Sequence, residues 1–330
     1  MKAASLGVLA LVAARVHAHV FCVGNALEFS TALATAASNG EADSIRLMRG
    51  VYAAGGFSFN SAETFGVDIA GGYDAGCVTS KPDARLSVLD GGGQRQVLQV
   101  NSPGPMSISY LTVQNGMQSG SSGGGLQIAG ASAAVLTNLI LRNNISDYAV
   151  AGAILSVQGD VRVENNLIVN NSAPATAALY ISLGSSGSVS MTNNTIAGNV
   201  NTSPNNTAFY LSMGSLAASA YISNNIFRGN TAVSDFSFFG NVQLNNNDYG
   251  VLDGSPAAGS SGNLSVDPHF VSTGDWHLRS DSPALTTALV NPSGGLPLVD
   301  IEGHARSYNG GVDMGAYERG DAIFADAFGD

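Results

Sequence analysis

The segment Asn-Asn-Leu-Ile-Val-Asn-Asn (165–171) decides the fold, because similar segments precede and follow it at nearly constant intervals. The related segments are Ser109 to Gly116, Thr-Asn-Leu-Ile-Leu-Arg-Asn (137–143), Asn-Asn-Thr-Ile-Ala-Gly-Asn (193–199), Asn-Asn-Ile-Phe-Arg-Gly-Asn (224–230) and Asn-Asn-Asp-Tyr-Gly (246–250). Their alignment places six residues at equivalent positions, spaced by 28, 28, 28, 31 and 22 residues: Leu111, Leu139, Leu167, Thr195, Ile226 and Asp248. A near-constant period of this length indicates a repeat architecture.

Each period has the same internal layout of short strands. A first alternating strand is expected at 126–128, 154–157, 179–183 and 209–213, a second at 135–137, 161–164, 189–192 and 221–223, and a third brief strand ends at the closing Asn. Three strands are too few for a propeller blade, which has four strands in about 40 residues, and the period-2 alternation excludes helical repeats. The sequence therefore predicts an all-β solenoid whose coils form parallel ladders around a shared core.

The Asn pairs have a structural explanation in such a solenoid. Asn tolerates the left-handed conformation that a sharp corner needs. Asn side chains of successive coils can also stack at a spacing of about 4.8 Å and bond along the ladder. We therefore predict a structural ladder, with ligand contact as the alternative, at Asn166, Asn194, Asn225 and Asn247.

These coils resemble the right-handed parallel β-helix repeat proteins of the pectin-lyase-like superfamily. Residues 43–52 resemble their I-x-L-x-x-G-x-Y opening coil, and Leu111 to Gly116 resembles their L-T-x-x-N-G coil. The stretches 267–270, 275–278, 282–284 and 311–318 resemble the closing module of choice-of-anchor Q β-helix proteins. The resemblance covers about residues 20–320. It implies a right-handed parallel β-helix, but not a reaction, because the fold hosts lyases, hydrolases, esterases and adhesins.

The ends of the chain predict export and capping. Lys2, the apolar run 6–14 and Val-His-Ala at 16–18 are typical of a signal peptide cleaved after Ala18. A helix is expected over 25–38, with Asn25 as N-cap, to cover the first coil. The expected organisation is a signal peptide (1–18), a β-helix with its N-terminal cap (19–265), a C-terminal capping module (266–320) and a tail (321–330).

Two cysteines, Cys22 and Cys77, are predicted to form a disulfide if the chain enters an oxidising compartment. Two buried free thiols are the alternative. The C-x-x-C spacing of redox motifs and zinc sites is absent, so neither is expected.

Composition limits the partners. The formal net charge is −11, and Lys2 and Lys81 are the only lysines, which excludes nucleic acid as an expected partner. No later stretch is long and apolar enough for a transmembrane helix. We expect a monomer without a cofactor, secreted or on the outer surface of a bacterial cell.

Candidate catalytic groups are few. Between Asn101 and Ser234 the acidic residues are Asp147, Asp160 and Glu164, and Lys and His are absent. Asp160 and Glu164 flank one strand, but four residues of extended chain separate them by about 13 Å, more than most paired carboxylates need. Asp160 and Glu164 are therefore weak catalytic candidates. The alternative is that they are solvated charges at the edge of the strand, with Glu164 in an ion pair with Arg162.

Two other groups are candidates for binding. Tyr180 and Tyr210 occupy similar places in adjacent coils and could contact sugar rings, although packing within an aromatic stack would explain them equally. Ten polar residues near the C-terminus could form a metal or catalytic cluster, or a hydrogen-bonded cap in which Arg306 pairs with Asp300 or Asp313: Asp267, His269, Asp275, His277, Asp300, Glu302, His304, Arg306, Asp313 and Glu318. Their irregular spacing matches no metal-ligand pattern, so no metal is expected.

The sequence therefore favours a non-catalytic β-helix protein that acts in adhesion or contacts a polysaccharide or cell-surface glycan. The alternative is a polysaccharide lyase or glycoside hydrolase of the same fold.

Overall fold

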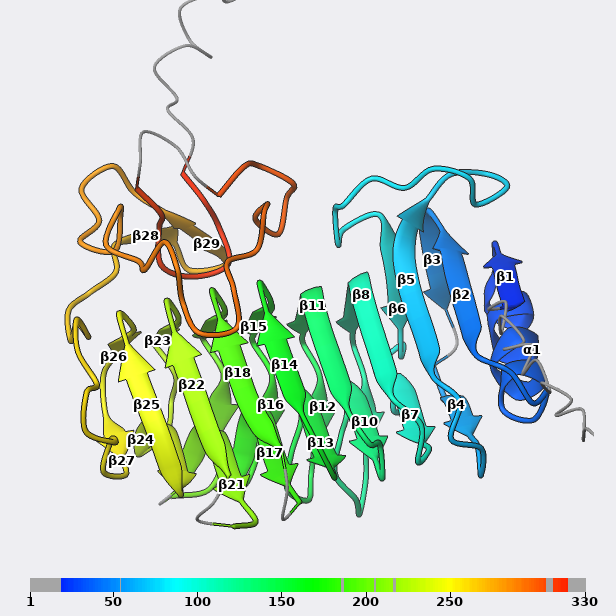
Figure 1. The fold of residues 1–330 in the computed structure, drawn as a ribbon, viewed down its shortest axis with the longest axis horizontal. Coiled ribbons are helices and arrows are strands. Elements are labelled where there is room, and N and C mark those ends of the chain that lie inside the picture. The colour runs from blue at the N-terminus through cyan, green and yellow to red at the C-terminus, as the bar shows by residue number, and fades with distance from the viewer. Residues whose placement is uncertain are drawn as a thin grey trace, which may run out of the picture.

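The computed structural model describes residues 19–53, 55–184, 187–204, 206–215, 218–306 and 311–319. Over this part the chain forms a right-handed parallel β-helix of about eight turns, with a single helix, α1 (Ala26–Ala36), at its N-terminal end (Figure 1). None of the helices in these ranges is both long and apolar enough to cross a membrane. The predicted signal peptide (1–18) and tail (321–330) lie outside the described residues.

Three parallel sheets run along the solenoid, and a separate antiparallel pair follows them. The first sheet contains β1 (His19–Val23), β2 (Asp43–Met48), β3 (Gly50–Ala53), β5 (Val67–Tyr73), β6 (Ser87–Asp90), β8 (Met106–Gln114), β11 (Ala134–Arg142), β14 (Val161–Glu164), β15 (Leu167–Val169), β18 (Ser188–Thr192), β19 (Thr195–Ala197), β22 (Ser219–Ser223), β23 (Ile226–Arg228), β25 (Asn241–Asn245) and β26 (Asp248–Tyr249). The second contains β4 (Phe57–Asn60), β7 (Leu98–Asn101), β10 (Leu126–Ala129), β13 (Ala153–Val157), β17 (Thr176–Leu183), β21 (Thr207–Met213), β24 (Ser234–Phe239) and β27 (Leu252–Asp253). The third contains β9 (Met117–Gln118), β12 (Ile145–Ser146), β16 (Ser172–Ala173) and β20 (Val200–Asn201), and the antiparallel pair is β28 (Phe270–Ser272) with β29 (Asp275–Leu278).

The coil has one more strand than the sequence pattern predicted. After the three expected strands, for example β13, β14 and β15, a two-residue strand such as β16 pairs with its counterparts in the neighbouring coils. Such a segment is too short for alternation to be recognisable in the sequence, so the prediction of three strands per coil was incomplete.

The structure also corrects the predicted alignment of the repeats by one residue. Leu167 pairs with Ile140, not with Leu139, and Leu139 pairs with Leu111. The segment at 137–143 lacks one Asn of the pair, and Leu139 occupies the place that Asn166 takes in the next coil, since the Asn166 side chain accepts a hydrogen bond from the Leu139 N–H. The repeat in this coil is therefore 27 residues long, as in the pairing of Ile140 with Leu167.

Alternation along the strands builds the core. In β13 the buried residues are Ala153, Leu155 and Val157, and the residues between them are half-buried on the outer face. Successive coils place like residues in register, so Phe209 and Phe236 stack with ring centroids 4.5 Å apart. Each coil buries its apolar residues only against its neighbours, as in other solenoids.

The helix α1 covers the N-terminal end of this core. The Asn25 side chain caps it by accepting a hydrogen bond from the Glu28 N–H. Its apolar side chains Phe29 and Leu33 are fully buried. The structure thus has the predicted capping helix, although it ends two residues before 38.

A C-terminal segment, defined here as residues 266–319, packs on one side of the solenoid above the later coils (Figure 1). It is held by an outer Asn row, the first Asn of each corner pair, in which every backbone has a positive φ. Each side-chain amide of this row donates to a backbone carbonyl of the segment: Asn138 to Asp300 (3.1 Å), Asn165 to Val299 (2.7 Å), Asn193 to Asp313 (2.9 Å), Asn224 to Leu289 (2.9 Å) and Asn246 to Thr287 (2.7 Å). The repeated corner is therefore also the docking surface for the end of the chain.

Candidate functional site

The second Asn of each pair forms an internal ladder. Asn166, Asn194, Asn225 and Asn247 are buried, and each donates its side-chain amide to the side-chain oxygen of the next Asn in the row, with Asn263 following Asn247, at 2.8–3.1 Å. Their side-chain groups are thus occupied within the wall of the solenoid. Contact between these four residues and a ligand would require breaking buried hydrogen bonds.

A second internal ladder was not predicted. Asn144, Asn171, Asn199 and Asn230 bond in the same way at the next corner, with side-chain distances of 3.0 Å. The signal was present as the closing Asn of each repeat, but the sequence alone did not show that this Asn points inward.

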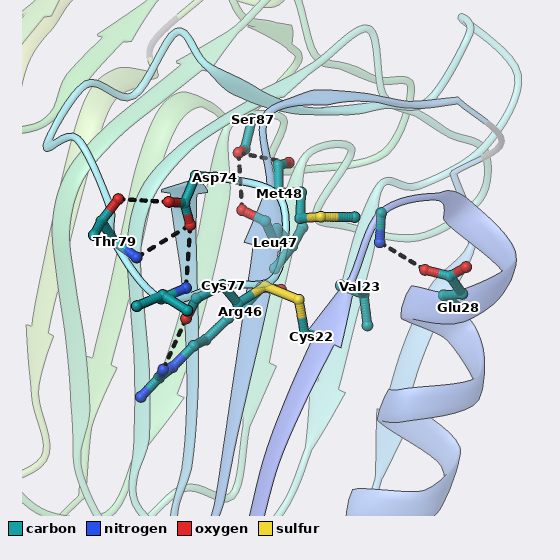
Figure 2. The surroundings of a disulfide bond; sticks show 12 residues. Cys22, Val23, Glu28, Arg46, Leu47, Met48, Asp74, Cys77, Thr79 and Ser87 are labelled. Carbon is teal, nitrogen blue, oxygen red and sulfur yellow. Dashed lines mark hydrogen bonds between the residues drawn. A yellow bond between two sulfur atoms is a disulfide. The ribbon is translucent and has the colours of Figure 1, made fainter.

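Figure 2 shows the predicted disulfide, which joins Cys22 on β1 to Cys77 in the loop after β5. The loop that carries Cys77 turns on Asp74, whose carboxylate accepts hydrogen bonds from the backbone and hydroxyl of Thr79. Arg46 on β2 donates to the Cys77 carbonyl at 3.0 Å. The disulfide therefore ties the first strand to the loop at residues 74–86, which rises from the same side of the solenoid as the C-terminal segment (Figure 1).

Asp160 and Glu164, the weak catalytic candidates, serve separate local contacts. The Asp160 carboxylate accepts hydrogen bonds from the N–H and hydroxyl of Ser188 in the next coil, at 2.8 and 2.9 Å. Glu164 is 6% exposed and forms an ion pair with Arg162 on the same strand. Burial raises the pKa of Glu164, and Arg162 partly opposes this rise. This ion pair has one buried partner, so it is not simply a surface pair.

Tyr180 and Tyr210 stack on the outer face of the second sheet. Their ring centroids are 5.4 Å apart and their planes differ by 25°. Each ring covers one face of the other, so the pair presents ring edges and hydroxyls, and neither hydroxyl has a hydrogen-bond partner within the described residues. A groove of about 320 Å³ runs beside the pair and is lined by Ala175, Thr176, Tyr180, Asn206, Thr207, Tyr210, Val233, Ser234, Ser237 and Asp253.

The outer face of the second sheet extends this groove. Strand register aligns one outward column across the coils: Ser58, Gln99, Gln127, Ile154, Tyr180, Tyr210, Ser237 and Asp253. At one end of the column the Ser237 hydroxyl donates to Asp253 at 2.9 Å. The column is mostly uncharged and polar, with its aromatic pair near the groove.

The C-terminal polar residues separate into two groups, the first of which is buried. Arg306 is 1% exposed and binds Asn165 and the Ala316 carbonyl, and its Nη1 lies 3.5 Å from the Glu318 carboxylate. The ion pair is therefore with Glu318, not with Asp300 or Asp313 as predicted. Asp300 instead accepts backbone hydrogen bonds at the turn that follows it.

Burial determines the charge state of this first group. It lowers the pKa of Arg306 to about 10, although the surrounding carboxylates oppose the shift. Burial, together with the charge of Asp313, raises the pKa of Glu318 to about 7. The pKa of Asp313 is also raised by burial. Several carboxylates around one buried guanidinium thus favour a partly protonated cluster, which is a structural hub of the segment.

The second group lines a cleft of about 420 Å³ between the C-terminal segment and the solenoid. The His277 Nδ1 is 2.6 Å from the Asp275 carboxylate, and its Nε2 is 3.1 Å from Glu302. Glu302 also pairs with Arg85 of the loop at 74–86 at 2.5 Å, which links segment and solenoid. Burial lowers the pKa of His277, but the hydrogen bonds with Asp275 and Glu302 outweigh it, so the pKa lies above its usual value.

The remaining polar residues of this stretch are not among those that line the cleft. The Asp267 carboxylate accepts from the His269 N–H, and the His269 ring pairs with Asp281 at 3.4 Å. His304 is exposed and lies 3.3 Å from the Asp300 carboxylate. In the described ranges, His, Cys, Asp and Glu residues nowhere gather in threes with the geometry to hold a metal ion.

Comparisons with known proteins leave the fold as the main result. No protein-family model matches the chain, and neither a curated protein nor a solved structure matches it.

Proposed function

We propose that this protein is a secreted or cell-surface β-helix protein of the pectin-lyase-like superfamily that contacts an extended glycan without cleaving it. The observation that carries the proposal is the groove beside Tyr180 and Tyr210, on a sheet face whose outward column is otherwise rich in Gln and Ser. The Cys22–Cys77 disulfide supports an oxidising compartment, and export with cleavage after Ala18 is part of the proposal.

The groove suits a sugar chain because it joins apolar edges to polar groups. Tyr180, Tyr210 and Val233 offer apolar surface, and the free hydroxyls with Ser237 and Asp253 offer hydrogen bonds. Sites of this kind combine apolar walls with a few polar groups that orient the ligand. The neighbouring outward residues continue in both directions along the solenoid, which favours a long ligand over a compact one.

The test is affinity-gel retardation of the purified protein in a panel of polysaccharides, with reducing ends and unsaturated products measured in parallel. We expect retardation without products, and binding about tenfold or more weaker in the Tyr180→Ala/Tyr210→Ala variant. The matched control is Tyr221→Ala, which removes a half-buried tyrosine from the outer face of β22 on the first sheet. Equal retardation of all three proteins would refute the groove as the binding surface.

A polysaccharide-degrading enzyme remains the second candidate, because the cleft under the C-terminal segment contains two carboxylates, Asp275 and Glu302. Against this candidate, both oxygens of Glu302 are engaged, by His277 and by Arg85, and Asp275 is bonded to His277 through its Oδ1. New reducing ends or unsaturated products that disappear in Glu302→Gln would favour the enzyme and overturn the non-catalytic proposal.

A further inference from the structure

The cleft between the C-terminal segment and the solenoid has groups that the fold does not use. Its floor consists of Ile140, Leu167 and Val169, outward residues of β11 and β15 that the segment covers. Trp276 of β29 forms one wall, and the His277 ring packs on Tyr317 with centroids 3.9 Å apart. A volume of about 420 Å³ is within the range of sites that hold a small molecule.

Two arginines and two carboxylates line the cleft, and among the described residues only one of these arginines, Arg85, forms an ion pair. Asp275 and Glu302 are both within hydrogen-bond distance of His277, Glu302 also pairs with Arg85, and Arg85 itself pairs with Asp83 at 2.9 Å. Arg142, at the end of β11, is different. Its Nε donates to the Gln114 side chain at 2.9 Å, but its guanidinium forms no ion pair with any carboxylate of the described residues. Arg142 is therefore the guanidinium of the cleft whose Nη groups remain open to an anionic ligand.

Two side-chain amides lie beside Arg142 in the same cleft. Asn143 and Asn170 occupy a second corner, with φ of 55° and 56°, and their side chains are exposed. Within the described ranges neither amide has a hydrogen-bond partner, in contrast to the outer Asn row and both internal ladders. An amide can donate to and accept from a hydroxyl at the same time, so this pair suits a hydroxylated ligand.

The next two coils show that this corner does not need Asn. Gly198 and Gly229 take the place of Asn170 in those coils, as the pairing of Val169 with Ala197 and of Ala197 with Arg228 implies. A Cβ at Gly198 would lie 2.7 Å from the Trp276 ring, so glycine allows the wall of the cleft to approach. Amides are thus present at Asn143 and Asn170, which line the cleft, whereas glycine stands at position 198, where Trp276 packs against the solenoid.

We propose that this cleft binds a small sugar derivative that carries one anionic group, a carboxylate or a phosphate. Arg142 binds the anion through its free Nη groups, Asn143 and Asn170 bind hydroxyls, and the sugar carbons lie against Trp276. Arg142 can bind either anion, because a guanidinium presents a planar fork of donors to both. The site is separate from the groove at Tyr180 and Tyr210 and does not depend on that proposal.

The test is titration calorimetry of the purified protein with four probes: gluconate, glucose 6-phosphate, glucose and inorganic phosphate. We expect binding of gluconate, of glucose 6-phosphate or of both, and weaker or no binding of glucose and inorganic phosphate. Gluconate alone would identify a carboxylate ligand, and glucose 6-phosphate alone a phosphate ligand. No binding of either sugar anion, or equal binding of glucose or inorganic phosphate, would overturn the proposal.

Variants locate the site. Arg142→Gln should weaken binding about tenfold or more, the loss expected when a charge-assisted hydrogen bond is removed. The double variant Asn143→Gly/Asn170→Gly removes both side-chain amides but keeps residues that tolerate the positive φ of the corner. It should also weaken ligand binding. Arg279→Gln is the control, since it removes the same charge from an exposed pair with Asp281 on the C-terminal segment. Unchanged affinity in Arg142→Gln, with a normal thermal melt, would show that the cleft is not the site.

Discussion

Replacement of Asn194 by Ala should strongly destabilise the solenoid. Asn194 is fully buried, and its side chain accepts from the N–H and the side-chain amide of Asn166. It also donates to the Val163 carbonyl at 2.8 Å and to the Asn225 side chain. The substitution leaves the Asn166 N–H and the Val163 carbonyl without these partners. At about 1–3 kcal/mol for each buried unsatisfied group, the expected loss is about 2–6 kcal/mol.

The backbone itself should not add to this loss. The positive φ in this pair belongs to Asn193, so Ala at 194 meets no left-handed strain. A matched control is Asn170→Gly, which removes an Asn side chain that is exposed and has no described hydrogen-bond partner. Glycine tolerates the positive φ at this corner, so the control should change the free energy of unfolding by less than about 1 kcal/mol.

The assay is urea unfolding followed by far-ultraviolet circular dichroism, with hydrogen exchange to locate the weakened coils. We expect a lower midpoint for Asn194→Ala and faster exchange in the coils next to it, because solenoid coils depend on their nearest neighbours. A midpoint for Asn194→Ala as high as that of Asn170→Gly would show that the ladder adds nothing to stability.

Three other perturbations test other parts of the structure. Cys22→Ser/Cys77→Ser should lower the free energy of unfolding by about 4 kcal/mol, since the disulfide closes a loop of 55 residues, and an unchanged urea midpoint would contradict this. The pKa of the Glu318 carboxyl is raised from 4.5 to about 7 in the folded state. The folded state therefore binds the proton of this carboxyl more tightly than the unfolded state does, and the stabilisation from that binding is lost as the pH rises from about 4.5 to 7. Thermal melts followed by the fluorescence of the single tryptophan, Trp276, should therefore show that the C-terminal segment is less stable at pH 8 than at pH 5. The variant Glu318→Gln should reduce this difference. An unchanged pH profile in the variant would exclude Glu318 as the source of the difference. Gly198→Ala should loosen the same segment, because the new Cβ would lie 2.7 Å from the Trp276 ring, and a wild-type emission spectrum and melting temperature would contradict this.

The coil architecture was predictable because it depends on local, repeated chemistry. Alternation of apolar residues placed the main strands, and the Asn pairs marked the corner, since both follow from the backbone geometry of a single coil. The same local reasoning failed at 137–143, where Thr-Asn-Leu was matched to Asn-Asn-Leu and the register slipped by one residue. A single Asn at a corner does not show by itself whether it points inward or outward.

The candidate sites were only partly predictable for a related reason. Tyr180 and Tyr210 could be placed in one column because the repeat fixes their register. The cleft could not be found in this way, since Arg85 and Glu302 meet across 217 residues and no period relates them. The predicted partner of Arg306 was wrong because Asp300, Asp313 and Glu318 are equally plausible in an irregular segment.

The sequence by itself determined a parallel β-helix with a capping helix, a structural use for its Asn pairs and a disulfide between Cys22 and Cys77. Only the tertiary structure divided each Asn pair into an inner residue that bonds along the wall and an outer one that holds the C-terminal segment. It alone also brought Arg142, Asn143 and Asn170 beside Trp276. The physical reason is that a repeat specifies contacts between successive coils. The docking of the irregular C-terminal segment depends instead on hydrogen bonds to its own backbone carbonyls, and these bonds leave no signature in the residue types of that segment.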